Sequence, residues 1–286
     1  MTTTNNDVSV VMLTKNSART IEQCLISVLE EHPAEVVAVD GMSTDATPEI
    51  LRRYGVRVIA DQSCSLGRAR QIGVEAANGA YIMFVDSDVE LTVGCIAKLK
   101  AEIERFGWGA IHAKIISRDN STYWQRAEND FFRMFLNPPG PQARIGLIAA
   151  MYRKDLLLEH PFDPNFVESA EDTDVCRRLR RDNYVLGISP TVIAYHTHRS
   201  EIYALFKQRF GYGKGTARVA LKYDTIPWTV AWAFAKPVFG TMFSVLKGKM
   251  YLIPFWFVVG VAEFAGIMSL LSKERRSSAV RTFDRK

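Results

Sequence analysis

The sequence predicts an α/β protein with a mainly parallel sheet, followed by a C-terminal hydrophobic helical region. Three observations support this fold class. Apolar strand-like segments alternate with helix-like segments over residues 8–88, which is typical of a parallel sheet covered by helices on both faces. Two of these strands, 35–40 and 81–85, end in or are followed directly by a carboxylate. Residues 226–246 and 251–271 are apolar stretches of 21 residues each, which as helices would be about 31 Å long.

The alternation in the first part of the chain follows from local patterns. Short apolar runs rich in branched and aromatic residues predict buried strands, and longer runs with helical spacing predict helices. Thr47 is expected to cap a helix that has Pro48 in its first position and ends at Gly55. The expected elements are strand 8–13, helix 18–31, strand 35–40, helix 47–55, strand 56–60, helix 65–78 and strand 81–85.

The regular alternation ends after residue 88. Acidic residues at 171, 172 and 174 are expected to open a helix, because the helix dipole favours negative charge at its N-terminus. The expected elements of this region are a helix ending near residue 106, strand 110–117, an aromatic-rich segment 123–136, strand 145–152, the helix after residue 169 and strand 191–198.

Three carboxylates are expected at the carboxyl edge of the sheet, where α/β proteins bind ligands. Asp40 ends one strand, and Asp86 and Asp88 follow another. The sequence contains neither GxGxxG nor GxxxxGK[ST], so it lacks the two common loops that hold phosphates. A nucleotide diphosphate bound at this edge would therefore need Mg2+ or Mn2+, which hard oxygen ligands such as Asp86 and Asp88 suit.

The charge of the chain is distributed unevenly. Residues 199–286 carry 15 Lys and Arg against 5 Asp and Glu, whereas residues 1–198 carry 21 against 26. The basic part also contains the two apolar stretches. This combination predicts membrane lipid as a partner and argues against nucleic acid.

The cysteines and the N-terminus indicate a reducing, cytosolic compartment. Cys24, Cys64, Cys95 and Cys176 are scattered without a CxxC pair, so we expect free thiols. The first residues lack the basic and apolar regions of a signal peptide.

Four motifs, in this order, resemble those of the inverting family 2 glycosyltransferases. Residues 36–47 (VVAVDGMSTDAT) look like the family's VVDDGSTDGT, and residues 67–73 (GRARQIG) look like its GxxxARNxG helix. Asp86-Ser87-Asp88 is similar to its metal motif, and Glu171-Asp172 to its Glu-Asp base motif. The resemblance covers about residues 8–196 and implies the GT-A fold, which is Rossmann-like.

The resemblance also implies the roles of individual residues. Asp40 would accept a hydrogen bond from the base or ribose, and Asp172 would take the proton of the acceptor hydroxyl. Glu171 beside it would raise the pKa of Asp172 by like-charge repulsion. The implied metal ligands are Asp88, Asp86 and His196, the last of these at the end of strand 191–198. The implied nucleotide-sugar-binding residues are Leu13, Thr14, Lys15, Asn16, Asp40, Arg70, Asp86, Ser87 and Arg209.

The sequence departs from the family pattern at three places. Gly41 replaces the second Asp of the family's Asp-Asp-Gly, and Gln71 replaces the usual Asn. Residues 13–16 read Leu-Thr-Lys-Asn where the family has Pro-Thr-Tyr-Asn, so an aromatic side chain over the base is missing. These departures affect which nucleobase of the donor the site would accept.

Residues 206–215 resemble a Gln-Arg-aromatic segment that follows the catalytic core of membrane-associated family members that make exopolysaccharides. Gln208 and Arg209 would then close over the donor diphosphate. The alternative is a basic interfacial helix that faces anionic lipid.

Two arrangements are open for the apolar stretches. In the first, they form a transmembrane hairpin with both ends and the catalytic domain in the cytoplasm, because basic residues flank its outer ends. Lys236 and Glu263 would lie at similar depth and pair. In the second, two amphipathic helices lie in the membrane interface. The expected domains are therefore 1–198 (catalytic), 199–224 (basic amphipathic) and 225–286 (hydrophobic helices and basic tail).

The sequence thus predicts an inverting, metal-dependent hexosyltransferase of the membrane. It would move a sugar from a nucleotide-sugar donor, UDP-linked more than GDP-linked, to a hydroxyl of a lipid-linked or cell-surface glycan acceptor. One alternative is a transferase that acts on polyprenyl or dolichyl phosphate, which is already ionised and needs no base. Another is a membrane-anchored scaffold with a decayed transferase fold.

Overall fold

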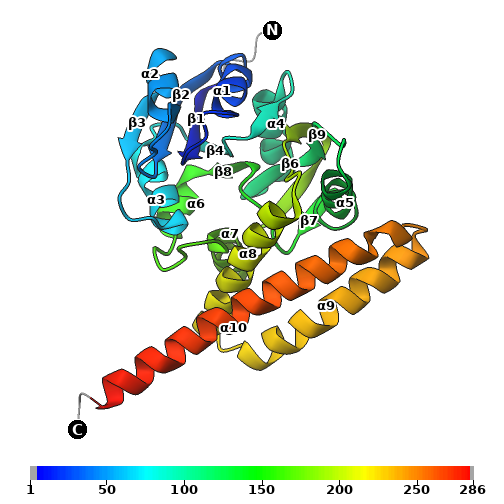
Figure 1. Cartoon of the computed structure of the whole chain (residues 1–286). Coiled ribbons are helices and arrows are strands. Elements are labelled where there is room, and N and C mark those ends of the chain that lie inside the picture. Colours follow the sequence, from blue (N-terminus) through cyan, green and yellow to red (C-terminus); the bar gives the residue numbers. More distant parts are fainter. Residues whose placement is uncertain (1–4, 284–286) are drawn as a thin grey trace. The chain divides into compact units, whose positions relative to one another are not determined.

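The computed structural model describes residues 5–283, with side chains as far as Arg276 (Figure 1). The chain divides into two compact units. The first comprises Met1–Asn120, Asn129–Val167 and Glu171–His198. The second comprises Ser121–Glu128, Glu168–Ala170 and Arg199–Lys286. The hydrophobic C-terminal part therefore groups with two short segments from earlier in the chain.

The first unit is built on one sheet. Within the described residues it has nine strands, in the order β3-β2-β1-β4-β8-β6-β9-β5, with β7 beside β9 (Figure 1). The strands are β1 (Asn5–Thr14), β2 (Pro33–Asp40), β3 (Arg57–Ala60), β4 (Tyr81–Val85), β5 (Val89–Leu91), β6 (Ala110–Ser117), β7 (Gly140–Gln142), β8 (Ala149–Arg153) and β9 (Leu186–His196).

The sheet is parallel in its first half and mixed in its second. β1 is parallel to both β2 and β4, and β2 is parallel to β3. β8 then runs antiparallel to β4 and β6, while β9 is parallel to β6 and antiparallel to β5. The expected α/β fold class is confirmed, but its mainly parallel character holds only for β3-β2-β1-β4. The parallel run ends at β8, because this strand lies antiparallel between β4 and β6.

Helices cover both faces of this sheet. Side chains of α3, α6 and α7 share a buried cluster with Ile82, Phe84 and Ala110. Met83 and Ile111 alternate with these residues along their strands and are also fully buried, so the opposite face is covered too. The helices of this unit are α1 (Ile21–Leu29), α2 (Thr47–Arg53), α3 (Leu66–Ala76), α4 (Cys95–Phe106), α6 (Lys154–Glu159) and α7 (Glu171–Arg181).

Three expectations from the sequence have clear outcomes. Gly55, with a φ of 71°, follows the last turn of α2 and ends it as expected. Thr47 is not the N-cap of α2, because its hydroxyl donates to Asp45 and accepts from the Ser17 amide instead. The four cysteines are free thiols, as expected.

The second unit is helical. It contains α8 (Ile202–Lys222), α9 (Ile226–Leu246), a short 3-10 turn (Met250–Leu252) and α10 (Ile253–Phe283). α5 (Tyr123–Phe131) begins in this unit and continues into residues of the first, where a π-helical turn (Phe132–Leu136) follows it. α9 and α10 are long and apolar enough to cross a membrane by length and composition.

α8 and α10 cross at close range because glycines line the contact. A Cβ atom added at Gly213 would lie 2.1 Å from the backbone oxygen of Glu263, and one at Gly266 would lie 2.1 Å from that of Phe210. Such distances leave no room for a side chain. The backbones of the two helices therefore touch at these positions.

This contact gives a matched pair of substitutions on α8. Gly213→Ala should lower the free energy of unfolding by about 1–3 kcal/mol, the usual cost of overpacking. Gly211→Ala, where an added Cβ meets nothing within 4 Å, should be neutral or stabilise by up to about 1 kcal/mol, because alanine favours helix. Thermal unfolding of the full chain in detergent measures both. Equal melting temperatures for the two variants would show that the crossing is not as tight as described.

Candidate active site

Asp40, at the end of β2, accepts hydrogen bonds from two neighbouring segments of the candidate site. Its Oδ1 accepts hydrogen bonds from the Thr14 hydroxyl (2.9 Å) and the Ser43 hydroxyl (2.6 Å), and its Oδ2 accepts from the Ser43 amide (2.8 Å). Asp40 and Thr14 are both buried. The carboxylate thus joins the end of β1 to the loop after β2. Most of its acceptor capacity is used inside the protein.

The loop after β1 is fixed by further hydrogen bonds. Asn16 has a φ of 51°, its amide donates to the Ser43 hydroxyl (2.8 Å), and its side-chain oxygen accepts from the Thr44 amide (2.8 Å). Leu13 packs against the buried cluster, and the ammonium of Lys15 points toward the Cys64 thiol. The structure therefore brings the expected nucleoside-binding residues Leu13 to Asn16 and Asp40 together.

Ser17 lies among the expected site residues, although the sequence did not single it out. Its hydroxyl lies 2.9 Å from the hydroxyl of Ser87, and its amide donates to Thr47. Asp45 accepts from the Ala18 amide and from Thr47, and the Thr47 hydroxyl lowers the pKa of this carboxyl group. The loops after β1, β2 and β4 are joined by these contacts. The only sequence signal for Ser17 was its place in a turn beside Asn16.

Arg70 lies between two of the expected acidic residues. Its Nη2 donates to Asp86 Oδ1 (2.9 Å), its Nε is 3.8 Å from Glu171 Oε1, and the guanidinium lies over the ring of Phe84 at 5.1 Å. The residue is only 5% exposed. Among the described residues, its Nε and Nη1 have no hydrogen-bond partner. Arg70 thus connects the end of β4 with the start of α7 and keeps donor atoms available.

The local fold of α3 explains the position of Arg70. The Ser65 hydroxyl caps the helix by accepting from the Arg68 amide (3.3 Å), and it donates to the backbone oxygen of Pro164 (2.6 Å). Gln71 accepts a hydrogen bond from the Phe162 amide (2.9 Å). These contacts anchor α3 against the chain that leads to α7.

Glu171 and Asp172 begin α7, as the acidic cluster predicted. Glu171 is buried, and burial, followed by repulsion from Asp172, raises the pKa of its carboxyl group to about 7, although Arg70 acts in the opposite direction. Asp172 is partly exposed, and its Oδ1 accepts from the Thr173 amide (2.6 Å). Burial also raises the pKa of Asp86, with Arg70 again opposing it. The two residues of the expected base motif therefore differ in burial.

His112 on β6 is a second residue that the sequence did not single out. It is buried, and burial lowers the pKa of its imidazole to about 4, although the negative charge of Asp172 favours protonation. Its Nε2 accepts from the Ala149 amide at 3.4 Å. A neutral imidazole therefore lies within the electrostatic reach of Asp172.

Two of the three expected metal ligands are in contact. His196 Nε2 lies 3.2 Å from Asp88 Oδ1, because Val89 pairs with His196 across β5 and β9. His196 Nδ1 is 3.0 Å from Nδ1 of His198, which is also buried. Asp86 is held by Arg70 instead. No group of three or more His, Cys, Asp or Glu side chains in the described part of the chain is arranged to hold a metal ion.

Arg209 belongs to the second unit. Its Nη2 is 2.8 Å from Glu128 Oε1 and its Nη1 is 3.7 Å from Glu263 Oε1, and the residue is buried. Its role at the donor diphosphate stays a prediction.

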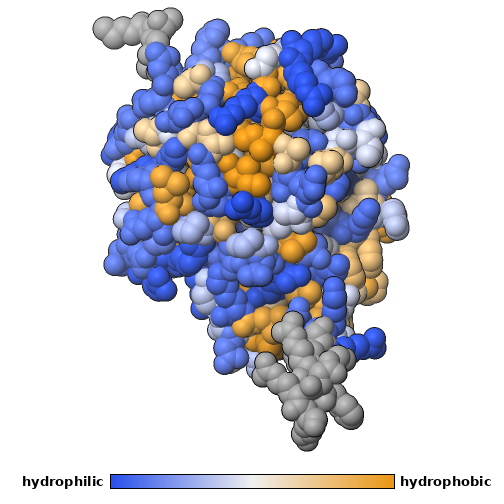
Figure 2. All heavy atoms as spheres, turned by 90° about the vertical axis from the view of Figure 1, so that its left-hand side faces the viewer, coloured by the Kyte–Doolittle hydropathy of each residue, from blue (hydrophilic) through white to orange (hydrophobic). Residues whose placement is uncertain are grey.

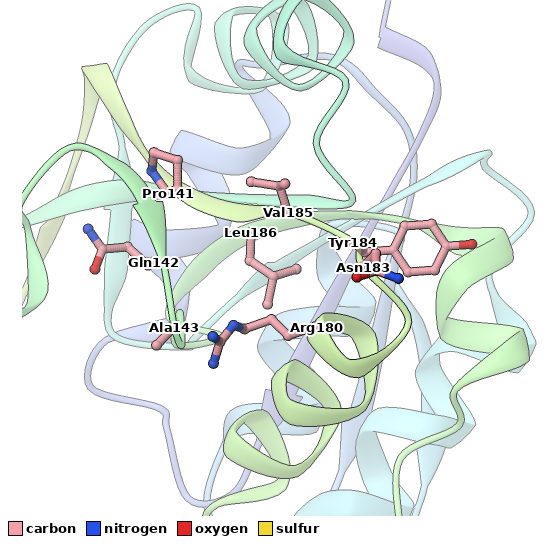
Figure 3. A pocket seen from close by; sticks show the side chains of 8 residues that line it. All are labelled: Pro141, Gln142, Ala143, Arg180, Asn183, Tyr184, Val185 and Leu186. Atoms are coloured by element: carbon pink, nitrogen blue, oxygen red, sulfur yellow. The ribbon is translucent and has the colours of Figure 1, made fainter.

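A cavity of about 340 Å³ in the first unit contains none of the expected site residues. Figure 3 shows the Arg180 side chain extending toward Ala143, with the ring of Tyr184 turned away from it. Arg180 lies near the C-terminal end of α7, whereas Glu171 and Asp172 lie at its N-terminal end. This cavity is therefore separate from the acidic site.

Comparison with known proteins identifies the family. The family model described as "Glycosyl transferase family 2" matches residues 9–159. The chain belongs to this family. It is a glycosyltransferase, and the resemblance expected from the motifs is confirmed.

Named relatives are of the same kind. The chain is 26% identical over 232 residues to "Glycosyltransferase AglE" of Haloferax volcanii, a match that covers 77% of this chain and 76% of that protein. It is 41% identical over 88 residues to "Succinoglycan biosynthesis protein ExoO" of Rhizobium meliloti, covering 29% of this chain and 25% of that one. The chain thus spans about a quarter of ExoO.

Solved structures share the fold. TarS residues 1–349 of S. aureus align with a TM-score of 0.53 at 18% identity, covering 94% of this chain and 91% of that one. GalNAc-T7, solved with UDP, GalNAc and Mn2+, aligns with a TM-score of 0.55 at 18% identity, covering 68% and 44%. A further TarS structure contains UDP-GlcNAc. These likenesses confirm the GT-A-like α/β fold.

The raised pKa of Glu171 predicts a pH-dependent stability. Because the folded state binds this proton more tightly than the unfolded state, the stabilising contribution is complete below about pH 4.5 and is lost as the pH rises through about 7. Glu171→Gln should therefore stabilise the protein more at pH 8 than at pH 5, by up to about 3 kcal/mol. Thermal unfolding at both pH values measures this difference. Glu159→Gln, an exposed change on α6, is the control, and a pH-independent effect of Glu171→Gln would contradict the assignment.

Proposed function

We propose that this chain transfers a sugar, with inversion, from a UDP-linked donor to a hydroxyl of a lipid-linked or cell-surface glycan acceptor. The observation that carries the proposal is the buried Arg70, which contacts Asp86 on the donor side and Glu171 beside the proposed base. This arrangement supports the proposal, because donor-binding and proton-accepting groups of a transferase would share one site. The UDP-sugar and UDP bound by structural neighbours support the choice of donor.

The donor half of the site would be formed by the loops after β1, β2 and β4. Thr14 and Asn16, which are both linked to Asp40 by hydrogen bonds, the latter through Ser43, would line the nucleoside together with Asp40. Arg70 has guanidinium nitrogens without a hydrogen-bond partner in the described residues, and a guanidinium fits the oxygens of a phosphate well. Arg70 would therefore neutralise part of the diphosphate charge.

The proposal includes a divalent cation, although the described residues show no preformed group of three ligands. Asp86 and Asp88 offer hard oxygens, and Mg2+ in transferase-like sites is commonly held by one or two carboxylates together with substrate phosphates and water. His196 contacts Asp88 and would complete the protein ligands. When bound, Mg2+ or Mn2+ would stabilise the negative charge of the leaving nucleoside diphosphate. GalNAc-T7, a structural neighbour, was solved with Mn2+.

Asp172 is the proposed base. Its carboxylate would take the proton of the acceptor hydroxyl while the acceptor oxygen forms a bond to the anomeric carbon, and the bond from that carbon to the diphosphate breaks. Glu171 has a pKa of about 7, so it is largely protonated below neutral pH and is then unable to act as the base. The attack and the departure occur on opposite faces of the sugar, which gives inversion.

The setting would be the cytoplasmic face of a membrane. Two long apolar helices in the second unit and the basic composition of residues 199–286 support attachment to lipid. The name of ExoO, a succinoglycan biosynthesis protein, supports a polysaccharide or lipid-linked acceptor.

The base assignment is tested by Asp172→Asn. We expect the rate of transfer from a UDP-sugar to fall by about 10²–10⁴-fold, with UDP binding unchanged, because the amide cannot take the proton. Transfer assays with a panel of nucleotide sugars and calorimetric UDP binding measure the two effects. Glu159→Gln is again the surface control. Unaffected turnover would instead support a phosphate acceptor, which needs no base.

The cation is tested by ligand-induced thermal shifts. UDP with Mn2+ should raise the melting temperature of the unchanged chain, and EDTA should abolish the shift. Asp88→Asn should lose most of the Mn2+-dependent part, whereas Asp155→Asn, an exposed change, should keep it. A UDP shift that is equally large with EDTA would remove the metal from the proposal.

A further inference from the structure

The hydroxyl of Tyr123 fixes the start of α10. It donates to the backbone oxygen of Tyr251 (2.8 Å) and accepts from the amide of Phe255 (3.1 Å). The first amides of a helix have no partner within the helix, so Tyr123 acts as a cap. Tyr251 belongs to the turn that joins α9 to α10. The tip of the α9–α10 hairpin is thus bound to the segment 121–128, which is part of the same compact unit.

A second tie lies further along α10. Glu128 contacts Arg209 (2.8 Å), Arg209 contacts Glu263 (3.7 Å), and Glu263 contacts Lys236 (2.5 Å). The predicted pairing of Lys236 with Glu263 is confirmed. These four groups join α5, α8, α10 and α9 in one chain of alternating charge. The segment 121–128 therefore contacts the first turn of α10 through Tyr123, and it is connected to Glu263 of α10 through Arg209.

These two ties are incompatible with a hairpin that crosses the bilayer. Crossing would carry the turn at residues 247–252 about 30 Å away to the opposite surface. The segment 121–128, with Arg126 and Glu128, would have to follow it. Its neighbours along the chain, Asn120 and Asn129, belong to the catalytic unit, so the backbone would cross the hydrocarbon twice more without an apolar helix. Lipid-exposed open backbone does not occur in that region, and charged side chains there are costly.

The exposed side of α9 nevertheless requires an apolar partner. Lys236, the only charged residue of this helix, contacts Glu263. Figure 2 shows that hydrophobic residues at the surface gather into patches. The large apolar residues of α9 that are exposed are Trp228, Trp232, Phe234, Val238, Phe239, Met242, Val245 and Leu246.

Basic residues lie at the ends of this apolar surface. Lys222 precedes α9, and Lys247 and Lys249 follow it, while Lys273 and Arg275 lie beyond the apolar part of α10. Such a border complements the negative charge of anionic lipid headgroups.

We infer that α9 and α10 form an in-plane membrane-docking surface, which enters one leaflet of an anionic bilayer and leaves the turn at residues 247–252 on the same side as the catalytic unit. The inference goes beyond the proposed function, because it concerns how the chain meets the membrane and is independent of the sugar that is moved.

The sidedness of the turn tests the inference. Cys64 is exposed in the catalytic unit and the other three cysteines are buried, so the unchanged chain reports the catalytic side. Cys64→Ser combined with Lys249→Cys reports the turn. Full-length chains in sealed vesicles of both orientations are treated with a membrane-impermeant maleimide. We expect both thiols to react in the same vesicle orientation. Reaction of residue 249 only where Cys64 is protected would overturn the inference.

The lipid partner is tested by flotation. After removal of detergent, the full chain should float with sealed vesicles that contain phosphatidylglycerol and should bind less to vesicles of phosphatidylcholine alone. Trp228→Glu with Trp232→Glu should reduce flotation, whereas Tyr203→Glu, an exposed change on α8, should not. A chain that stays soluble with both kinds of vesicle would overturn the docking surface.

The Tyr123 cap has its own readout. Tyr123→Phe should raise the hydrogen-exchange rate of amides at residues 252–256 in the vesicle-bound chain by about tenfold or more, because the Phe255 amide loses its acceptor. Tyr203→Phe is the matched control. Unchanged exchange in Tyr123→Phe would show that the cap is absent in the membrane and would favour a spanning hairpin.

Discussion

The ion pairs of Arg70 are the interaction on which the catalytic unit depends. A buried guanidinium is costly unless its charge is matched, and here carboxylates from two distant parts of the chain, Asp86 and Glu171, match it. The pairing fixes α3, the end of β4 and the start of α7 relative to one another. It also sets the acidity of the site, because burial raises the pKa of Glu171 while the cation limits the rise. One side chain thus joins the architecture of the unit to its proposed chemistry.

The sequence predicted the carboxylates of the candidate site, because their positions in the sequence pattern are distinctive. Paired carboxylates after an apolar strand, and an acidic pair at a helix start, are unusual enough to be recognised, and the structure places Asp86, Asp88 and Glu171 as expected at these element ends. Ser17 and His112 were missed because their contacts depend on strands that are far apart in the sequence. The mixed second half of the sheet was missed for the same reason. β8 lies between β4 and β6, and no local pattern records which neighbours a strand will have.

The second unit shows the limit of hydropathy as a guide. By length and apolar composition, α9 and α10 are possible membrane spans. These two properties do not show which contacts hold the turn between the helices. That information lies in Tyr123 and Glu128, more than a hundred residues earlier in the sequence. The pairing of Lys236 with Glu263 could be predicted, because two charges in an apolar hairpin need each other. Their connection through Arg209 to α5 could not.

The buried charges of the second unit balance one another, whereas those of the catalytic unit do not. In the second unit, Arg209 and Lys236 balance Glu128 and Glu263, so the cluster is formally neutral and suits a position beside lipid. In the catalytic unit, Arg70 contacts Asp86 and Glu171, and Asp88 and Asp172 add negative charge near these two carboxylates. Even with Glu171 protonated, these carboxylates outnumber the guanidinium. A site with such an excess is incomplete as a structural ion pair. Under the proposed function, a bound cation would offset this excess and allow the site to accept the diphosphate, which Arg70 alone would not neutralise.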